Sequence, residues 1–292
     1  MDELWDAVVI GGGAAGLNGA VMLARSRRSV VVVDSGTPRN APAGGVHGML
    51  GLDGIPPAEL LERGRAEVRR YGGQVRSGQV VGAKPDGDAF TVTLADGVEL
   101  HARRVLVATG LRDVLPDVPG LAEHWGRGVV HCPYCHGWEV RDEPIGVLSS
   151  PHHAVLFRQL TDDLVFFANG TELDDETRAK LGGIRVVETP VAAVESTKDA
   201  ITGVRLVDGE VVPRRVIAVA TKMFARTEGV EGLGLPVEDT PHGRRFVSGM
   251  AGTTPVKGVW VAGNATDLTA QVGASAAAGA LAGAHMNADL LA

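Results

Sequence analysis

The sequence contains only two cysteines, Cys132 and Cys135, which stand three positions apart in a chain of 292 residues. A secreted framework of disulfide bonds uses more cysteines at wider spacing, so this scarcity argues against an extracellular scaffold. A single Cys-x-x-Cys pair in a reducing compartment indicates redox chemistry or half of a metal site. The short motif is therefore the first candidate for a functional centre.

Positive charge and long apolar stretches are also scarce. The formal net charge is −7, which gives no basic surface for nucleic acid or for an anionic membrane. No apolar run reaches the roughly 18 residues that a membrane-spanning helix requires. The N-terminus lacks the basic and apolar regions of a signal peptide. We therefore expect a cytoplasmic protein that binds neither nucleic acid nor membrane.

The length and the apolar pattern predict two α/β domains. Residues 7–33 show a strand, a glycine-rich turn, a helix and a second strand, which is the opening of a parallel α/β sheet. Two further strands of this sheet are expected at 105–108 and 258–262, and a close-packed alanine- and glycine-rich helix at 271–291. The chain between these strands has strand candidates of its own, at 145–148, 164–168, 184–187, 204–206 and 216–220. This pattern predicts a smaller α/β unit inserted into the first one.

The first strand runs into Gly11-x-Gly13-x-x-Gly16, which opens the first helix. Glycines at this spacing permit a tight turn and a close approach of backbone N–H groups to a pyrophosphate at the helix N-terminus. Asp34 ends the next strand, where a carboxylate can accept a hydrogen bond from a ribose hydroxyl. The alternative is a glycine turn without a ligand, and the motif alone does not separate FAD from NAD.

The Cys-x-x-Cys pair allows two interpretations. A zinc site needs two more ligands, and the flanking His131 and His136 are too crowded beside the cysteines to complete a tetrahedron. A redox pair is favoured instead, because Pro133 restricts the turn and a helix start lowers the pKa of a thiol. His136 follows the second cysteine directly, so we interpret it as the proton acceptor for thiol–disulfide exchange, against the alternative of a simple structural histidine.

Several stretches together resemble the low-molecular-weight thioredoxin reductases, a family of flavoproteins. Residues 8–16 resemble the family's FAD phosphate loop, and residues 105–110 resemble its Ala-Thr-Gly strand end. Residues 258–267 are similar to its C-terminal FAD motif, and residues 127–132 match the approach to its redox cysteines. The resemblance covers nearly the whole chain.

The resemblance implies FAD as cofactor, a homodimer and two Rossmann-like dinucleotide-binding domains of the three-layer ββα type. The second domain, residues 114–225, is then inserted into the first, residues 1–113 and 226–292. Cys135 would lie against the flavin and Cys132 would exchange with substrate. The FAD contacts that the resemblance implies are Gly11, Gly13, Ala14, Ala15, Gly16, Asp34, Ser35, Arg39, Asn40, His47, Ala108, Gly263, Asn264, Gln271 and Val272.

Three departures separate this chain from the familiar reductases. Their second domain carries another glycine triad for NADPH and a basic cluster for its 2′-phosphate, whereas here residues 149–153 read Ser-Ser-Pro-His-His and residues 169–171 read Asn-Gly-Thr. His136 stands where they carry an acidic residue, and Asn264 stands where they carry Asp. Cys-Pro-Tyr-Cys-His-Gly-Trp-Glu at 132–139 is similar to the dithiol oxidases of the gliotoxin and holomycin type.

The resulting hypothesis is an FAD-dependent oxidase that closes a small-molecule dithiol into a disulfide and passes the electrons to O2, with release of H2O2. The alternative is a reductase of thioredoxin or a similar protein that draws electrons from reduced ferredoxin or NADPH. A third possibility is a non-enzymatic flavin redox sensor. No metal is expected in any of the three.

Overall fold

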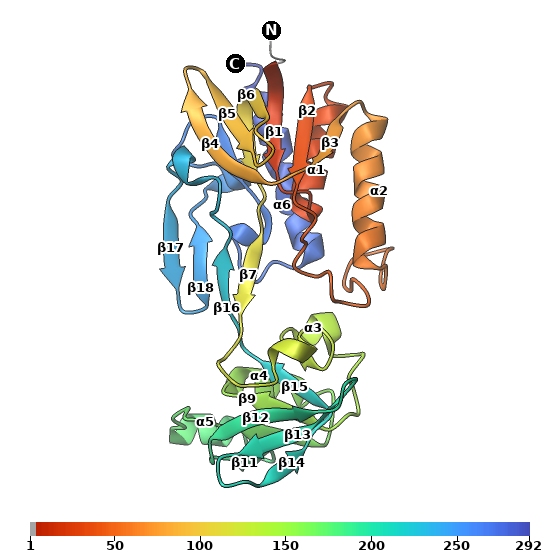
Figure 1. Cartoon of the computed structure of the whole chain (residues 1–292), viewed down its shortest axis with the longest axis vertical. Helices are drawn as coiled ribbons and strands as arrows, with labels where there is room; N and C mark the ends of the chain where they lie inside the picture. The colour runs from red at the N-terminus through yellow and green to blue at the C-terminus, as the bar shows by residue number, and fades with distance from the viewer. Residues whose placement is uncertain (1–3) are drawn as a thin grey trace. The chain divides into compact units, whose positions relative to one another are not determined.

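The computed structural model describes residues 4–292, which form two compact units (Figure 1). Unit 1 comprises the chain up to Ala41 together with Met49–Arg112 and Met223–Ala292, and unit 2 comprises Pro42–Gly48 and Asp113–Lys222. Both units are α/β, and most of unit 2 is one continuous segment inserted into unit 1. The prediction of two Rossmann-like domains is confirmed.

Unit 1 is built on a seven-stranded sheet. Its order is β3 (Gln74–Ser77), β2 (Val30–Asp34), β1 (Leu4–Ile10), β6 (Glu99–Val107), β5 (Ala89–Leu94) and β4 (Val80–Asp86), with β19 (Val259–Val261) also paired to β6. The strands β1, β2, β6 and β19 are parallel, and Ile10 is level with Val33 and Val107. Their carboxyl ends therefore form one edge, where ligands bind in open α/β sheets.

Three helices pack in unit 1: α1 (Ala14–Arg25), α2 (Pro57–Arg70) and α6 (Val272–Asp289). Helices α1 and α6 touch through their backbones. A Cβ atom on Gly279 would lie 1.9 Å from the Ala15 carbonyl oxygen, and one on Gly283 would lie 2.5 Å from that of Gly19. These pairs advance together along both helices, so the helices run parallel, and α6 begins about six residues ahead of α1. The contact explains why the sequence of α6 is so rich in alanine and glycine.

A second sheet of four strands carries the chain between the units. Its order is β17 (Val237–Thr240), β18 (Gly243–Phe246), β16 (Lys222–Ala225) and β7 (Leu111–Val114). Strand β7 leads out of unit 1 and β16 leads back into it (Figure 1). Short 3-10 turns complete this unit at Glu231–Leu233, Met250–Gly252 and Gly263–Ala265.

Unit 2 has three layers. Its central sheet is parallel, in the order β11 (Arg185–Val187), β10 (Leu164–Phe167), β9 (Ile145–Leu148), β15 (Val216–Val219) and β8 (Val129–Val130). One face packs on the antiparallel strands β12 (Val191–Ser196), β13 (Ile201–Leu206) and β14 (Val211–Pro213), through a core that includes Phe167 and Ile201. On the other face, Phe157 of α4 (Pro151–Phe157) packs against Phe166. The remaining helical segments are α3 (Pro133–His136), α5 (Asp175–Lys180) and the turn Ala122–His124.

None of the helices that residues 4–292 form is long and apolar enough to cross a membrane.

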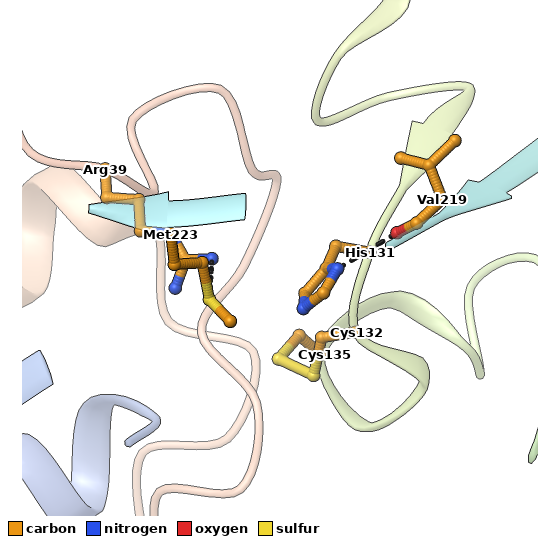
Figure 2. Close-up of a disulfide and its surroundings, with 6 residues drawn as sticks. All are labelled: Arg39, His131, Cys132, Cys135, Val219 and Met223. Carbon is orange, nitrogen blue, oxygen red and sulfur yellow. Dashed lines mark hydrogen bonds between the residues drawn. A yellow bond between two sulfur atoms is a disulfide. The ribbon is translucent and has the colours of Figure 1, made fainter. Parts of the chain in front are cut away.

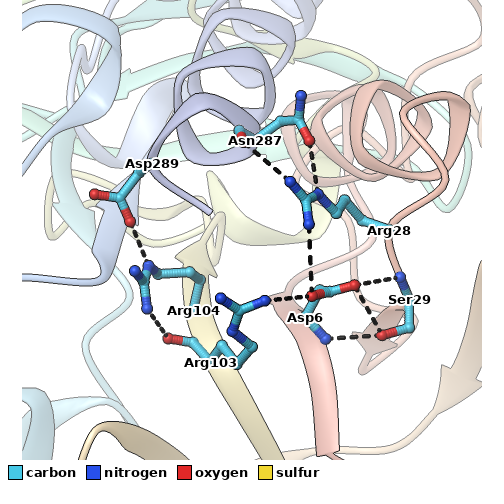
Figure 3. A network of polar contacts seen from close by, with 7 residues as sticks. All are labelled: Asp6, Arg28, Ser29, Arg103, Arg104, Asn287 and Asp289. Carbon is cyan, nitrogen blue, oxygen red and sulfur yellow. Dashed lines mark hydrogen bonds and ion pairs between the residues drawn. The ribbon is translucent and has the colours of Figure 1, made fainter. Parts of the chain in front are cut away.

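Asp6, in β1, lies at the centre of a polar network at the end of unit 1 where β1 begins and α6 ends (Figure 3). Its carboxylate accepts hydrogen bonds from the Ser29 backbone N–H at 2.9 Å and from Arg103 at 3.0 Å. Arg28 lies 4.0 Å away and also donates to Asn287 of α6 at 2.8 Å. Burial alone would raise the pKa of Asp6, but these donors and the charge of Arg28 outweigh it and lower the pKa. The ionised carboxylate therefore joins β1, β6 and α6.

We expect Asp6→Asn to lower the free energy of unfolding by about 1–3 kcal/mol at pH 7, because it removes the charge while leaving the surrounding donors in place. The folded-state pKa of Asp6 lies below its unfolded value of about 3.9. Its stabilisation is thus present above that pH and is lost as the pH falls through the folded pKa. Thermal unfolding between pH 7 and pH 3 should show the two proteins converging in acid. Asp239→Asn, which breaks the exposed pair with Arg244, is the matched control and should change stability little.

Candidate active site

Cys132 and Cys135 form a disulfide within unit 2, with their Cα atoms 5.2 Å apart (Figure 2). The Cys132 carbonyl accepts hydrogen bonds from the backbone N–H groups of Cys135 and His136, both at 3.2 Å. Pro133 occupies the first helical position, where its missing N–H costs nothing. A Cβ atom on Gly137 would lie 2.1 Å from the Pro133 carbonyl oxygen, so the tight turn requires glycine there. This turn brings the two sulfurs together, and both cysteines are half-buried.

His136 follows the disulfide with an imidazole ring whose two nitrogens are both buried without a hydrogen-bond partner. Burial lowers the pKa of His136; the charge of Glu139 opposes this shift and His47 adds to it. The ring is therefore neutral at neutral pH and has a nitrogen able to accept a proton. Buried polar atoms are ordinarily hydrogen-bonded, so these two nitrogens keep an unmet capacity for hydrogen bonding.

The His47 Nε2 atom and the Glu139 carboxylate lie 3.3 Å apart beside this ring, in unit 2. The resemblance associated His47 with the flavin, and that contact stays a prediction. Sequence reasoning did not single out Glu139. Its only signal is a spacing of three from His136, which places both side chains on one side of the same turn.

The two sulfurs are bonded to each other, which leaves neither as a thiolate ligand. Among residues 4–292, no three or more His, Cys, Asp and Glu side chains gather as a metal ion would require.

In unit 1 the glycine loop between β1 and α1 is shaped by close backbone contacts. Gly11 has φ = +108°, and a Cβ atom there would lie 2.3 Å from the Ala108 carbonyl oxygen. A Cβ atom on Gly16 would lie 1.8 Å from the Gly11 carbonyl oxygen. Gly13 is different, because a Cβ atom there would meet no protein atom within 4 Å. Gly11 and Gly16 are thus required by the turn itself, whereas Gly13 keeps the space above the turn open.

The starts of α1 and α6 both lack a side-chain cap. The first backbone hydrogen bond of α1 runs from the Leu17 N–H to the Gly13 carbonyl, which leaves the preceding N–H groups without intrahelical acceptors. Helix α6 begins in the same way, with the Ser275 N–H bonded to the Gln271 carbonyl. The helices are parallel, and the contact between Gly279 and Ala15 means that α6 begins about six residues, or ~9 Å, ahead of α1. The start of α1 could hold the pyrophosphate of a dinucleotide such as FAD, and the start of α6 could contact another part of the same molecule.

Asp34 lies against the glycine loop at the end of β2. A Cβ atom on Gly12 would lie 2.6 Å from its carboxyl carbon. Its carboxylate accepts a hydrogen bond from the Gly36 N–H at 3.2 Å and lies 3.7 Å from Arg65 of α2. A carboxylate in this position could accept a hydrogen bond from a ribose hydroxyl.

The other predicted flavin contacts divide between the units. Arg39 donates a hydrogen bond to the Met223 sulfur at 3.6 Å. Ser35 is exposed, and its hydroxyl is hydrogen-bonded to that of Thr37. The Asn264 side-chain oxygen lies 3.4 Å from where a Cβ atom on Gly110 would stand. Unit 1 contains Gly11, Gly13, Ala14, Ala15, Gly16, Asp34, Ser35, Arg39, Asn40, Ala108, Gly263, Asn264, Gln271 and Val272, and unit 2 contains His47 with Cys132, Cys135 and His136.

The corresponding helix start in unit 2 is already occupied by its own side chains. Pro151 has no N–H, and the Ser150 hydroxyl accepts the His153 N–H at 3.3 Å. The Ser150 carbonyl accepts the Ala154 N–H at 3.1 Å. After β10, the Asn169 side chain accepts the Val191 N–H at 2.9 Å and is likewise engaged. Backbone donors like those that could hold a pyrophosphate at the start of α1 are largely absent from α4.

Comparison with known proteins supports these features. Residues 5–156 match the pyridine nucleotide-disulphide oxidoreductase family. The chain belongs to this family and is an oxidoreductase. The match confirms the resemblance to thioredoxin reductase-like enzymes that the sequence motifs indicated.

Relatives align with almost the full length of this family member. The thioredoxin reductase tcpT of Claviceps purpurea is 32% identical over 305 residues, covering 98% of this chain and 94% of the relative. The thioredoxin reductase sirT of Leptosphaeria maculans is 30% identical, with the same coverage. The crystal structure of HlmI superimposes with a TM-score of 0.92 and 44% identity, covering 100% of this chain and 94% of that one.

We expect Gly13→Ala to weaken flavin binding by about tenfold, or ~1.4 kcal/mol, while leaving the apoprotein as stable as the native one. The added methyl group meets no protein atom within 4 Å, so it can clash only with a bound group. Flavin retention after dialysis and the melting temperature of the apoprotein measure the two effects. Gly82→Ala, whose methyl group would make an ordinary 3.8 Å contact with Thr93, is the matched control. Unchanged flavin affinity in Gly13→Ala would contradict this view of the loop.

Proposed function

We propose that the protein is an FAD-dependent dithiol oxidase, which closes a small-molecule dithiol into a disulfide, uses O2 as electron acceptor and works as a homodimer. The observation that carries this proposal is the contrast between two helix starts. The N–H groups at the start of α1 are open for a pyrophosphate, whereas Pro151 and Ser150 close the start of α4. A second dinucleotide as electron donor is therefore disfavoured, and the electrons are left to come from the dithiol.

The chemistry of the disulfide follows from its neighbours. His136 takes the proton of a substrate thiol, and the resulting thiolate attacks the Cys132 sulfur. The bond between the two cysteines breaks, a mixed disulfide with Cys132 forms, and Cys135 leaves as a thiolate. The second substrate thiol then attacks the sulfur of its own molecule in the mixed disulfide. That step closes the product disulfide and releases Cys132 in its reduced form.

Bound FAD would supply the two-electron acceptor that restores the cysteine disulfide and hands the electrons on to O2. The residues that would hold it are those of the glycine loop, Asp34 and the start of α6. A neutral, half-buried His136 suits the first step, because a base with a lowered pKa stays unprotonated in mildly acidic solution.

The alternative is reduction of thioredoxin or a similar protein, which the names of the relatives tcpT and sirT favour. It uses the same disulfide in the opposite direction and needs an external donor such as NADPH or reduced ferredoxin.

We expect the air-saturated holoenzyme to consume O2 and form an equimolar amount of H2O2 when dithiothreitol is added as a probe dithiol. Cys132→Ser and Cys135→Ser should each reduce this turnover at least ~1000-fold, since neither can form the internal disulfide. NADPH alone under anaerobic conditions should leave the flavin absorbance unchanged. If NADPH bleaches the flavin and no dithiol is turned over, the protein is a reductase and not an oxidase. Bleaching by dithiol without multiple turnovers in air would indicate a sensor.

The lowered pKa of His136 predicts that the acid limb of the kcat/KM profile falls at a pH below 6.5, the ordinary value for this side chain. His136→Gln should lose this limb and about 100- to 10,000-fold of the rate. Because the charge of Glu139 raises the pKa of His136, Glu139→Gln should move the limb to still lower pH. Steady-state rates between pH 5 and pH 9 measure these shifts. An acid limb that persists unchanged in His136→Gln would assign it to another group.

A further inference from the structure

Three histidines occupy the part of unit 2 where the glycine triad is missing. His152 and His153 lie in α4, directly after β9, and His131 follows β8 and precedes Cys132. The His131 and His153 rings are 5.1 Å apart between centroids, and the His152 and His153 rings are 6.0 Å apart. The segment that lacks a nucleotide fingerprint thus supplies two imidazoles, His152 and His153, and the His153 ring lies in a tilted contact with that of His131.

His131 has a defined tautomer. Its Nδ1 atom lies 2.9 Å from the backbone carbonyl oxygen of Val219, at the end of β15. A carbonyl can only accept, so Nδ1 carries the hydrogen and Nε2 carries the lone pair in the neutral ring. Figure 2 shows the opposite side of the ring extending toward the disulfide. The basic nitrogen is therefore on the side of Cys132.

His153 is held in place from two directions. The Ser150 hydroxyl accepts the His153 backbone N–H and lies 2.8 Å from its Nδ1 atom. Since the hydroxyl oxygen already accepts one hydrogen bond, its own hydrogen can point to Nδ1. The ring also stacks on the buried Phe157, with 6.4 Å between centroids and 18° between planes. A ring fixed in this way limits the rotation of the neighbouring His131.

We propose that His131 is a second acid–base group of the redox centre, dedicated to Cys132, and that His153 and Ser150 position it. The inference rests on the proposed thiol–disulfide chemistry and assigns a different histidine to each of two proton transfers. His136 serves the entering substrate thiol, and His131 serves the cysteine that is released and must later react again.

The protons balance with this assignment. In the ring-closing step the second substrate thiol forms a bond to its partner sulfur, and the bond between that sulfur and Cys132 breaks. The proton of the second thiol goes to Nε2 of His131, and the imidazolium passes it to the Cys132 thiolate or stays paired with it. When the cysteine disulfide is restored, Cys132 must be a thiolate again, and its proton returns through His131. The two electrons leave through the flavin acceptor already proposed.

Other ionisable groups lie on the elements around His131. Helix α4 presents His152 and His153, and α3 is followed by Glu139, which is paired with His47. On the side of β15, Asp113 is hydrogen-bonded to Thr221 at 2.7 Å. None of these precedes the cysteine or has a ring fixed to the end of β15 as His131 does.

The test is the pH dependence of Cys132 alkylation in the reduced holoenzyme. After anaerobic reduction with dithiothreitol and removal of the reagent, iodoacetamide is added between pH 5 and pH 10 and labelling at Cys132 is followed by peptide mass spectrometry. We expect a native midpoint below the ~8.5 of a free thiol, because an imidazolium stabilises the thiolate. In His131→Gln the midpoint should rise by about one unit, with roughly tenfold slower labelling at pH 7.

Matched variants separate a chemical role from a structural one. His131→Asn gives a second, shorter replacement in case His131→Gln fails to fold, and flavin absorbance reports the fold in both. His153→Phe keeps a stacked ring and should retain the native midpoint, whereas His153→Ala should move it part of the way. His152→Gln is the control and should leave it unchanged. A native profile in His131→Gln or His131→Asn, or an equal shift in His152→Gln, would overturn the proposal.

Failure of the oxidase proposal is distinguishable from failure of this one. Alkylation of the reduced cysteine needs no oxygen and no natural substrate. If the alkylation midpoint shifts in His131→Gln but the native enzyme shows no turnover in air, the role of His131 stands and the oxidase proposal is rejected. If the native enzyme consumes oxygen but the midpoint does not shift in His131→Gln, the oxidase proposal stands and the role of His131 is rejected.

Discussion

The backbone contact between α1 and α6 is the constraint on which the candidate cofactor site depends. Gly279 lies so close to Ala15 that no side chain fits between the helices. Because the helices are parallel, both uncapped N-termini point toward the carboxyl edge of the sheet, and the contact fixes the position of one start relative to the other. A larger residue at Gly279 or Gly283 would separate the helices and change that position. The site is thus a property of a helix pair and not of the glycine loop alone.

Both units contain a strand–turn–helix element, but its helix start is open in unit 1 and closed by side chains in unit 2. In unit 1 the turn exposes N–H groups, and Gly13 keeps the space before them open. In unit 2 the equivalent turn satisfies itself through Ser150 and Pro151, and His153 lies against His131 beside the disulfide. The same short segment thus both closes the helix start and places an imidazole near the redox pair. The fold persists because both turns sit on a buried parallel sheet.

Much of this architecture could be predicted from the sequence. Apolar runs bounded by small residues located the central strands well, and 145–148 has the bounds expected. The antiparallel strands of unit 2 were harder, since the half-exposed residues 191–196 lack a clear apolar pattern. The pairing of Glu139 with His47 could not be predicted either, because it joins segments about ninety positions apart. Short motifs indicate which residues carry the chemistry, whereas contacts between distant segments, such as that of Glu139 with His47, depend on how the whole chain folds.

The main segment of unit 2, Asp113–Lys222, begins in β7 and ends in β16, and this order has a consequence for biosynthesis. Unit 2 is almost continuous, so its sheet can form while the chain is still emerging from the ribosome. Unit 1 lacks both β19 and α6 until residues 259–289 have been made. Its glycine loop, at residues 11–16, is synthesised long before the helix that packs against α1. A cofactor site that used the starts of both helices could therefore form only after α6 has been made, whereas unit 2 can fold earlier.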